Sequence, residues 1–223
     1  AADSGYEYGT CQSTFGSTST PYGVFWMSSK QGKVFQYSEG LKEISRTGMK
    51  WWLSRYMPFM ILEDFPDFPL TDNSVNGVGT SVIYDSTEEL VYFSKKDYML
   101  RPEFKGQLVH VRDNQFALAN NRLVTITLQD PNYFAEASWT LSYDLKTNSW
   151  VSLHDWHPNL MIPSQSHFFS IKDDKLWLHN DTCQSFCNYY GTDYPFEVEI
   201  LSNTGVTVTT LRSVEYQVEA YQY

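Results

Sequence analysis

The chain has 223 residues, with 16 Lys and Arg against 26 Asp and Glu, and therefore a formal net charge of −10. Nucleic-acid affinity depends on basic side chains that neutralise phosphates, so this balance excludes binding of DNA or RNA through bulk charge and disfavours anionic membrane surfaces. Hydrophobic residues make up 42% of the sequence and charged residues only 19%, which excludes an intrinsically disordered chain.

The first 21 residues are rich in Gly, Ser and Thr without any apolar period, and they predict an extended arm that is ordered only by what it lies against. A hairpin is expected next, from residues 22–27 through a turn to residues 33–37, with a further strand at 41–44.

Residues 49–57 form the best helix candidate, because the apolar side chains of Met49, Trp52, Leu53 and Tyr56 follow the helical spacing and Pro58 ends the run. We expect one short helix. Residues 64–79 contain two prolines and predict a long loop with aromatic anchors.

From Thr80 onward the chain is predicted to be almost entirely strand and turn. Two apolar runs, residues 108–111 and 123–128, add strands to a series of hairpins. Further strand pairs are expected at residues 81–84 with 90–94, 139–143 with 149–153, 167–171 with 175–179, and 196–201 with 206–211, followed by an alternating strand at 214–221.

The predicted fold is therefore mainly β, with antiparallel meanders that form partial β-propeller-like blades and one short helix. Each hairpin carries aromatic residues and buries one face only when a neighbour stacks on it. A complete propeller needs more residues than this chain supplies. We therefore expect residues 1–21 as an arm and 22–223 as a propeller-like domain that is a fragment of a larger polypeptide.

The segment from Tyr143 to Trp150 has the pattern of a kelch-type turn, in which Tyr and Trp pack between blades while Asp144 and Thr147 close the turn through side-chain hydrogen bonds. We interpret it as architecture. Residues 84–87 are a weaker copy of the same turn.

A metal site is one interpretation of His179, Cys183 and Cys187, which could supply three ligands to a tetrahedral zinc ion. No fourth ligand is evident, so the favoured interpretation is a loop with two ordinary thiols or one local disulfide. The redox state of Cys183 and Cys187 stays open. No cofactor or metal is predicted.

Catalytic candidates are equally incomplete. His154, Asp155 and His157 lie within four residues, yet no nucleophile elbow, zinc-protease motif or phosphate-binding loop occurs in the chain. Scattered carboxylates could form a glycosidase pair, because such pairs are defined by distance in space. They are expected instead to cap turns or to lie at a hairpin tip: Asp64, Asp67, Asp173 and Asp174. We predict no catalytic residues.

Packing and turn signatures lie at residues 22–26, 48–52, 91–98, 143–144, 150–158, 167–170, 194–199 and 213–216. Together these segments resemble the muzzle proteins of crAss-like phages and, more loosely, the propeller-bearing nozzle proteins of other short-tailed phages. The resemblance covers residues 22–223.

This resemblance implies a structural, non-enzymatic virion component that forms a ring homo-oligomer around the tail channel. Its expected partners are neighbouring copies, other tail proteins and other segments of the same longer polypeptide. Neither sequence-specific nucleic-acid binding nor a membrane-spanning segment is expected. An acidic balance suits a DNA conduit, because a negative lumen does not trap passing phosphates.

Two other functions stay open at this point. A carbohydrate- or receptor-binding module, or a glycan hydrolase, would use exposed aromatic rings and acids. A kelch-like interaction domain of cellular origin is disfavoured because the chain has few glycine-rich repeats.

Overall fold

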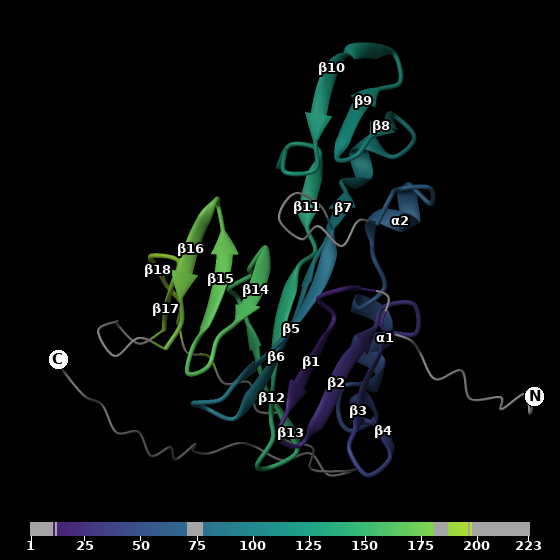
Figure 1. Ribbon diagram of the computed structural model, residues 1–223. Helices are drawn as coiled ribbons and strands as arrows, with labels where there is room; N and C mark the ends of the chain where they lie inside the picture. Colours follow the sequence, from purple (N-terminus) through teal and green to yellow (C-terminus); the bar gives the residue numbers. More distant parts are fainter. Residues whose placement is uncertain (1–10, 12, 71–77, 181–186, 196, 198–223) are drawn as a thin grey trace, which may run out of the picture.

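The computed structural model describes residues 11, 13–70, 78–180, 187–195 and 197, and these are mainly β, as predicted (Figure 1). Three antiparallel sheets form the body of the molecule. The first sheet is a meander of β1 (Ser17–Thr20), β2 (Gly23–Ser28), β3 (Lys33–Tyr37) and β4 (Leu41–Glu43). The middle sheet has the order β13-β12-β6-β5, with β5 (Gly79–Asp85), β6 (Leu90–Lys96), β12 (Trp139–Asp144) and β13 (Ser149–His154). The third sheet contains β14 (Leu160–Pro163), β15 (Phe168–Lys172) and β16 (Lys175–Leu178).

The middle sheet lies between the other two, and its strands β5, β6 and β12 are buried on both faces, whereas Val151 and Leu153 of the edge strand β13 are exposed. Successive side chains of a strand point to opposite faces, so neighbouring residues enter different cores. Phe93 packs toward the first sheet beside Phe25 and Met27, whereas Tyr92 packs toward the third sheet beside Met161. Because both faces are covered, burial is nearly continuous along β5, β6 and β12, and it includes the polar side chains of Thr80, Ser94 and Thr140.

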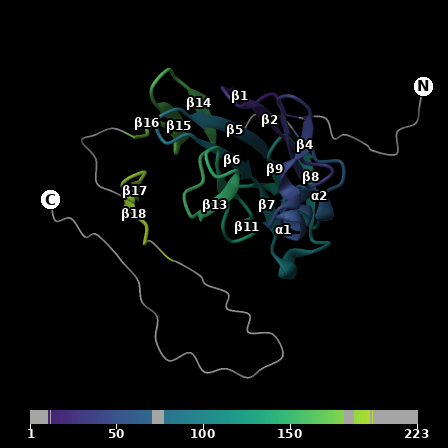
Figure 2. The ribbon, with the colours of Figure 1, turned by 90° about the horizontal axis from the view of Figure 1, so that it is seen from below.

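The first strands of the three sheets, β1, β5 and β14, lie side by side, and the sheets diverge from this line (Figure 2). Each sheet then adds its later strands outward in chain order. Antiparallel hairpins suit this arrangement because each needs only a short turn.

A separate unit interrupts the middle sheet between β6 and β12 and projects away from the three sheets (Figure 1). Its neck is the pair β7 (Tyr98–Leu100) and β11 (Phe134–Glu136), and its outer part is the sheet β8 (Leu108–Arg112), β9 (Gln115–Leu118) and β10 (Asn121–Thr127). The unit has its own core, in which Phe116 contacts Phe65, Phe68 and Phe134. We call it the projection.

Helix α1 (Lys50–Tyr56) confirms the predicted helix, and Leu53 is fully buried on its inner face. The sequence predicted one short helix, but the structure contains two α-helices among the described residues. A one-turn helix, α2 (Ile61–Asp64), follows where the sequence shows no full helical period, and two 3-10 turns occur at η1 (Ile44–Arg46) and η2 (Pro102–Phe104). Residues 65–70 form the expected loop, anchored by buried Phe65 and Phe68.

Three predicted hairpins in the second half are confirmed as β5 with β6, β12 with β13, and β15 with β16. The predicted strands beyond residue 197, the hairpin partner at 196–201 and most of the arm lie outside the described residues. The described end of the arm forms β1, which is held by pairing with β2. A small hairpin, β17 (Asn188–Tyr189) and β18 (Thr192–Asp193), follows the third sheet.

Candidate functional site: a buried ion pair at the base of the projection

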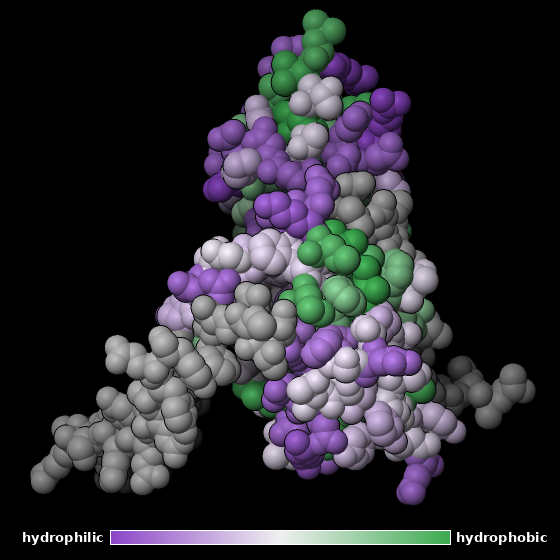
Figure 3. Space-filling view, turned by 60° about the vertical axis from the view of Figure 1, so that its left-hand side comes forward, coloured by the Kyte–Doolittle hydropathy of each residue, from purple (hydrophilic) through white to green (hydrophobic). Residues whose placement is uncertain are grey.

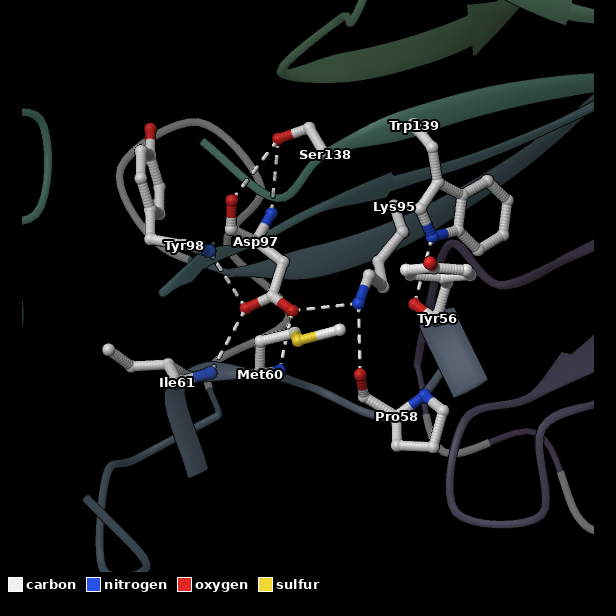
Figure 4. A network of polar contacts seen from close by, with 9 residues as sticks. All are labelled: Tyr56, Pro58, Met60, Ile61, Lys95, Asp97, Tyr98, Ser138 and Trp139. Atoms are coloured by element: carbon white, nitrogen blue, oxygen red, sulfur yellow. Dashed lines mark hydrogen bonds and ion pairs between the residues drawn. The ribbon is translucent and has the colours of Figure 1, made fainter. Parts of the chain in front are cut away.

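A buried ion pair lies where the chain leaves the middle sheet for the projection (Figure 4). Lys95 is near the end of β6 and Asp97 follows the strand, so both side chains point to the same side of the chain. The Lys95 Nζ atom lies 2.7 Å from Asp97 Oδ2, and both side chains are 0% exposed. A strand end with two lysines and an aspartate would normally be solvated, and burial here requires that every charge finds a partner.

The segment between the two α-helices supplies those partners. Lys95 Nζ donates a second hydrogen bond to the carbonyl oxygen of Pro58 at 2.9 Å. The Asp97 carboxylate accepts hydrogen bonds from the backbone N–H of Met60 at 2.6 Å, of Tyr98 at 2.8 Å and of Ile61 at 3.5 Å. The carboxylate thus satisfies N–H groups at the start of α2, where helical N–H groups have no partner within the helix.

The backbone of Asp97 joins the two strands of the neck. Its carbonyl oxygen accepts a hydrogen bond from the N–H of Ala137 at 2.9 Å, and its N–H donates to Ser138 Oγ at 3.2 Å. Nearby, Trp139 Nε1 donates to the carbonyl oxygen of Tyr56 at 3.0 Å. A single cluster therefore ties the entry and exit of the projection to the end of α1 and the start of α2.

Burial shifts the pKa values of both ionic partners toward their neutral forms: it lowers the pKa of Lys95 and raises that of Asp97. The opposite charge and the hydrogen bonds act against this shift on each side. The pair is consequently stable only while both members are present, because removing one would leave an uncompensated buried charge.

A polar pocket of about 460 Å³ lies between the projection and the third sheet. Lys96, which lines it, donates a hydrogen bond from Nζ to Asn159 Oδ1 at 2.8 Å, and burial lowers its pKa to about 8. Glu136 also lines the pocket and lies 3.4 Å from His157 Nδ1, and a hydrogen bond from that imidazole holds the pKa of Glu136 down at about 2. The pocket contains acids and bases together: Lys96, Lys172, Glu136, Asp173 and Asp174.

A buried histidine, His179, and a half-buried one, His154, lie between the middle and third sheets. His179 Nε2 lies 2.7 Å from Ser170 Oγ, which is 2.9 Å from the hydroxyl oxygen of Tyr190, and His154 Nε2 lies 3.0 Å from Ser142 Oγ. Desolvation lowers the pKa of each imidazole to about 4, so both are neutral at pH 7. The stacked ring of Phe168, 4.2 Å from that of His179, shows that these imidazoles belong to the core.

The structure does not bring His154 and His157 together in one site. His154 faces the core and His157 pairs with Glu136. Cys187 is exposed and Cys183 lies outside the described residues. Among the residues that the structure describes, no group of three His, Cys, Asp or Glu side chains could hold a metal ion.

The carboxylates considered for a glycosidase pair fall into two groups. Asp64 pairs with Lys105 at 3.4 Å and Asp67 is exposed, and neither lines the pocket. Asp173 and Asp174 occupy the hairpin tip between β15 and β16, as predicted, and line the pocket from there.

The kelch-type turn is confirmed as architecture. Asp144 Oδ1 accepts from the Lys146 N–H at 2.7 Å, and Oδ2 accepts from Thr147 Oγ1 at 2.9 Å. Tyr143 packs edge-on against Trp150 at 5.2 Å, and both rings lie in the core between the first and middle sheets. In the weaker copy, Asp85 Oδ1 likewise accepts from the Thr87 N–H at 2.9 Å.

Sequence reasoning missed Lys95 and Asp97. A signal was present, because the charged residues 95–97 stand between two apolar strand segments with no turn residue among them. A charged run in such a position is expected to stay within the sheet and to be covered.

Together, the fold and this site define a structural class of protein: stacked antiparallel sheets whose buried charges and imidazoles bind the protein's own backbone and side chains. In keeping with this class, the family model of the Crassvirus muzzle protein matches residues 6–174, about three quarters of the chain. The chain belongs to this family, and the resemblance to the muzzle proteins of crAss-like phages inferred from the sequence is confirmed. It is a structural protein of a phage virion and a component of the tail. No curated protein matches the chain. In the part of the chain that the structure covers, no helix is both long and apolar enough to cross a membrane.

Proposed function

We propose that the chain is a non-enzymatic assembly unit that contributes to a ring around the tail channel. In this role it contacts neighbouring copies of itself, other tail proteins and other segments of a longer polypeptide. The observation that carries the proposal is that, among the described residues, both outer faces of the three-sheet stack carry exposed apolar side chains.

Both outer faces of the stack carry exposed apolar side chains. On the first sheet, Val24 and Tyr37 are directly opposite each other and are 40% and 56% exposed. On the third sheet, Leu176 and Leu178 are 63% and 40% exposed. Large exposed apolar areas are uncommon on soluble monomers and usually mark surfaces that another element covers.

The divergence of the sheets from β1, β5 and β14 supports the propeller-like interpretation. In a propeller, each four-stranded blade packs face to face on the next, and four to eight blades typically close the circle. Three sheets would then be part of such a circle, with the remaining blades supplied by other segments of the polypeptide.

Helix α1 offers a further contact point. Trp51 is 83% exposed, with Lys50 Nζ 5.7 Å from its ring centre, and tryptophan is among the residues most enriched at the energetic centres of protein interfaces. The net charge of −10 suits a passage for DNA, because an acidic wall does not retain phosphates.

The test is the mass of the complete protein in solution, measured by native mass spectrometry and by light scattering over a dilution series. A ring predicts a discrete multiple of the subunit mass with a closed stoichiometry. A stable monomer that turns over a substrate would contradict both the ring and the non-enzymatic role.

The second candidate is a carbohydrate- or receptor-binding module, with glycan hydrolysis as its enzymatic form. The polar pocket favours it, because carboxylates and an amide line a space of about 460 Å³. A glycan array distinguishes the two functions: the assembly role predicts no hits, and a binding module predicts hits that are lost when Asn159, which lines the pocket, is replaced by Leu.

A further inference from the structure

Two neighbouring lysines at the end of β6 are buried but have different partners. Lys95 forms the ion pair with Asp97, whereas Lys96 points to the opposite side of the strand, toward the third sheet. Lys96 is 8% exposed, and its Nζ atom donates a hydrogen bond to Asn159 Oδ1 at 2.8 Å. No ion pair of the described residues includes Lys96. A buried ammonium group normally has an ionic partner, but here the partner is a neutral amide.

Asn159 directly precedes β14 and is held in place by the third sheet. Its backbone N–H donates a hydrogen bond to the carbonyl oxygen of Ile171 at 2.7 Å, and the residue is 9% exposed. Lys96 is held in a similar way, because it pairs with Gly79 between β6 and β5. The two side chains therefore meet where the middle and third sheets join, and strand pairing fixes both backbones. Groups held in one geometry react far faster than groups that must first meet by diffusion.

The hydrogen bond places the amine nitrogen of Lys96 near the amide carbon of Asn159. Because a C=O bond is about 1.2 Å long, a nitrogen atom 2.8 Å from Oδ1 lies at most about 4 Å from Cγ. Bound groups react from separations of about 3–3.5 Å. Rotation about the last torsion of Asn159, which has a broad minimum, is enough to turn Cγ toward the nitrogen.

Burial also makes the amine of Lys96 available for reaction. A lysine side chain is a nucleophile only in its neutral form, and desolvation favours that form. Burial is the main reason why the pKa of Lys96 is lowered to about 8, and the charge of Lys172 acts in the same direction. The charges of Glu136, Asp173 and Asp174 act against this shift. At pH 7 about a tenth of the Lys96 side chains are therefore neutral amines.

Water reaches the site although both reacting side chains are buried. Lys96 and Asn159 line the polar pocket, and Asp173 and Asp174 of the same pocket are exposed. Figure 3 turns the side of the third sheet forward and shows hydrophilic side chains where the projection meets the body of the molecule. A proton or a product as small as ammonia can leave through such a pocket.

We propose that Lys96 and Asn159 condense to an intramolecular isopeptide bond, which joins the end of β6 to the start of β14. The ammonium group first gives a proton to water in the pocket, and the neutral Nζ then attacks Cγ. The new C–N bond forms, and the bond from Cγ to Nδ2 breaks. The amide nitrogen leaves as ammonia with one proton from the attacking nitrogen, and the proton released earlier converts it to ammonium.

The reaction consumes no oxidant, cofactor or second protein. Its product is a neutral amide, so it removes a buried charge that lacks an ionic partner. It occurs once in each chain, without turnover. The proposal does not depend on ring assembly, because both residues belong to one copy.

The test is the intact mass of the complete chain together with a tryptic peptide map. After incubation at pH 8, the wild-type mass should be lower than the sequence mass by about 17 Da, which is one ammonia. Trypsin does not cut after an acylated lysine, and Pro102 prevents cleavage after Arg101. The map should therefore contain a branched peptide in which residues 96–105 are joined to residues 147–172. Fragmentation of this peptide should locate the link between the two side chains.

Three variants assign the bond to its residues. Lys96→Arg keeps the positive charge and Asn159→Ala removes the amide, so each should have its full sequence mass and give no branched peptide. The matched control is Lys172→Arg, which changes another lysine of the same pocket. This control should retain the mass loss and the branched peptide.

Two results for the wild-type chain would overturn the proposal. One is the full sequence mass after prolonged incubation at pH 8. The other is the same mass loss without the branched peptide, because a succinimide formed by Asn159 and the following backbone nitrogen also releases ammonia but leaves Lys96 open to trypsin. Neither result depends on the folding of a variant or on the oligomeric state, so the outcome is separate from that of the proposed function.

Discussion

The buried pair of Lys95 and Asp97 makes a sharp energetic prediction. Replacing Asp97 with Asn removes the negative charge that compensates the buried ammonium group of Lys95. It also puts an amide NH2 group in the place of one carboxylate oxygen, where it opposes either Lys95 Nζ and the Met60 N–H or the N–H groups of Ile61 and Tyr98. Breaking one side of a buried pair typically costs about 3–5 kcal/mol. We expect a loss of about 4 kcal/mol in the free energy of unfolding for Asp97→Asn.

Replacing Lys95 with Met, which keeps most of the side-chain volume, should cost about 3 kcal/mol, near the lower end of the same range. The smaller effect is expected because the carboxylate keeps its backbone donors at Met60, Tyr98 and Ile61. The double variant contains no buried charge. Its free energy of unfolding should therefore be no lower than that of Asp97→Asn alone, a loss of about 4 kcal/mol. The two single losses together exceed this value by about 3 kcal/mol, and this excess is the coupling energy between the two side chains.

The assay is urea denaturation followed by tryptophan fluorescence, completed as a double-mutant cycle. The control cycle uses Lys33→Met and Glu43→Gln, because that pair is 3.8 Å apart with side chains 39% and 20% exposed. A surface pair of this kind should couple by less than about 1 kcal/mol. The reasoning is refuted if the two replacements at 95 and 97 are additive within about 0.5 kcal/mol.

Three further predictions follow from other parts of the molecule. Gly32 has φ +62, and a Cβ at this position would lie 2.6 Å from Ser54 Cα of α1, so Gly32→Ala should lower the free energy of unfolding by about 2–3 kcal/mol in urea denaturation. The control is Gly106→Ala, which has φ +74 but open space around the Cβ and should cost only about 1 kcal/mol. Equal losses in the two variants would contradict the predicted clash with α1. Trp51→Ala should change the free energy of unfolding by less than about 0.5 kcal/mol but weaken assembly of the oligomer in native mass spectrometry. Trp52→Ala removes an indole 5.3 Å from that of Trp139 and should lower the free energy of unfolding. Unchanged oligomer assembly in Trp51→Ala would exclude Trp51 as a contact between copies. The folded-state pKa of about 4 for His154 and His179 lies below the unfolded value of 6.5, so the unfolded chain binds more protons between these pH values. The free energy of unfolding should therefore fall as the pH drops from 6.5 to 4. The variant His179→Asn should reduce this pH dependence, and an unaltered dependence would show that His179 does not titrate as a buried group.

The hairpin series could be predicted from sequence because its signals are local. Asp144 and Asp85 close turns through hydrogen bonds to residues only two or three positions away, and the strands on either side are long enough to show alternation or continuous apolar runs. Helix α1 was likewise visible from its apolar spacing and from Pro58. The local sequence of such elements specifies their secondary structure, and the tertiary contacts agree with it.

The projection could not be predicted as a unit because its neck strands, β7 and β11, have three residues each and pair across more than thirty residues of intervening chain. A three-residue strand shows no period. The charge pair was hidden for a related reason: Lys95 and Asp97 are buried by the segment at residues 58–61, which is distant in sequence. Polar groups in such positions are identified only when the covering segment is known.

Because Lys95 and Asp97 bind segments that are distant in sequence, the pair connects the projection to the rest of the fold. Apolar contacts at the neck would permit small rotations of the projection, because hydrophobic burial is not directional. Asp97 instead joins its own strand to two other segments at once: its carboxylate binds the start of α2, and its carbonyl oxygen and N–H bind Ala137 and Ser138 at the exit of the projection. Hydrogen bonds to a buried charge weaken steeply when their geometry is disturbed, so the projection is held at one angle to the three sheets. In the ring proposed above, such a joint would give the projection the same orientation in every copy.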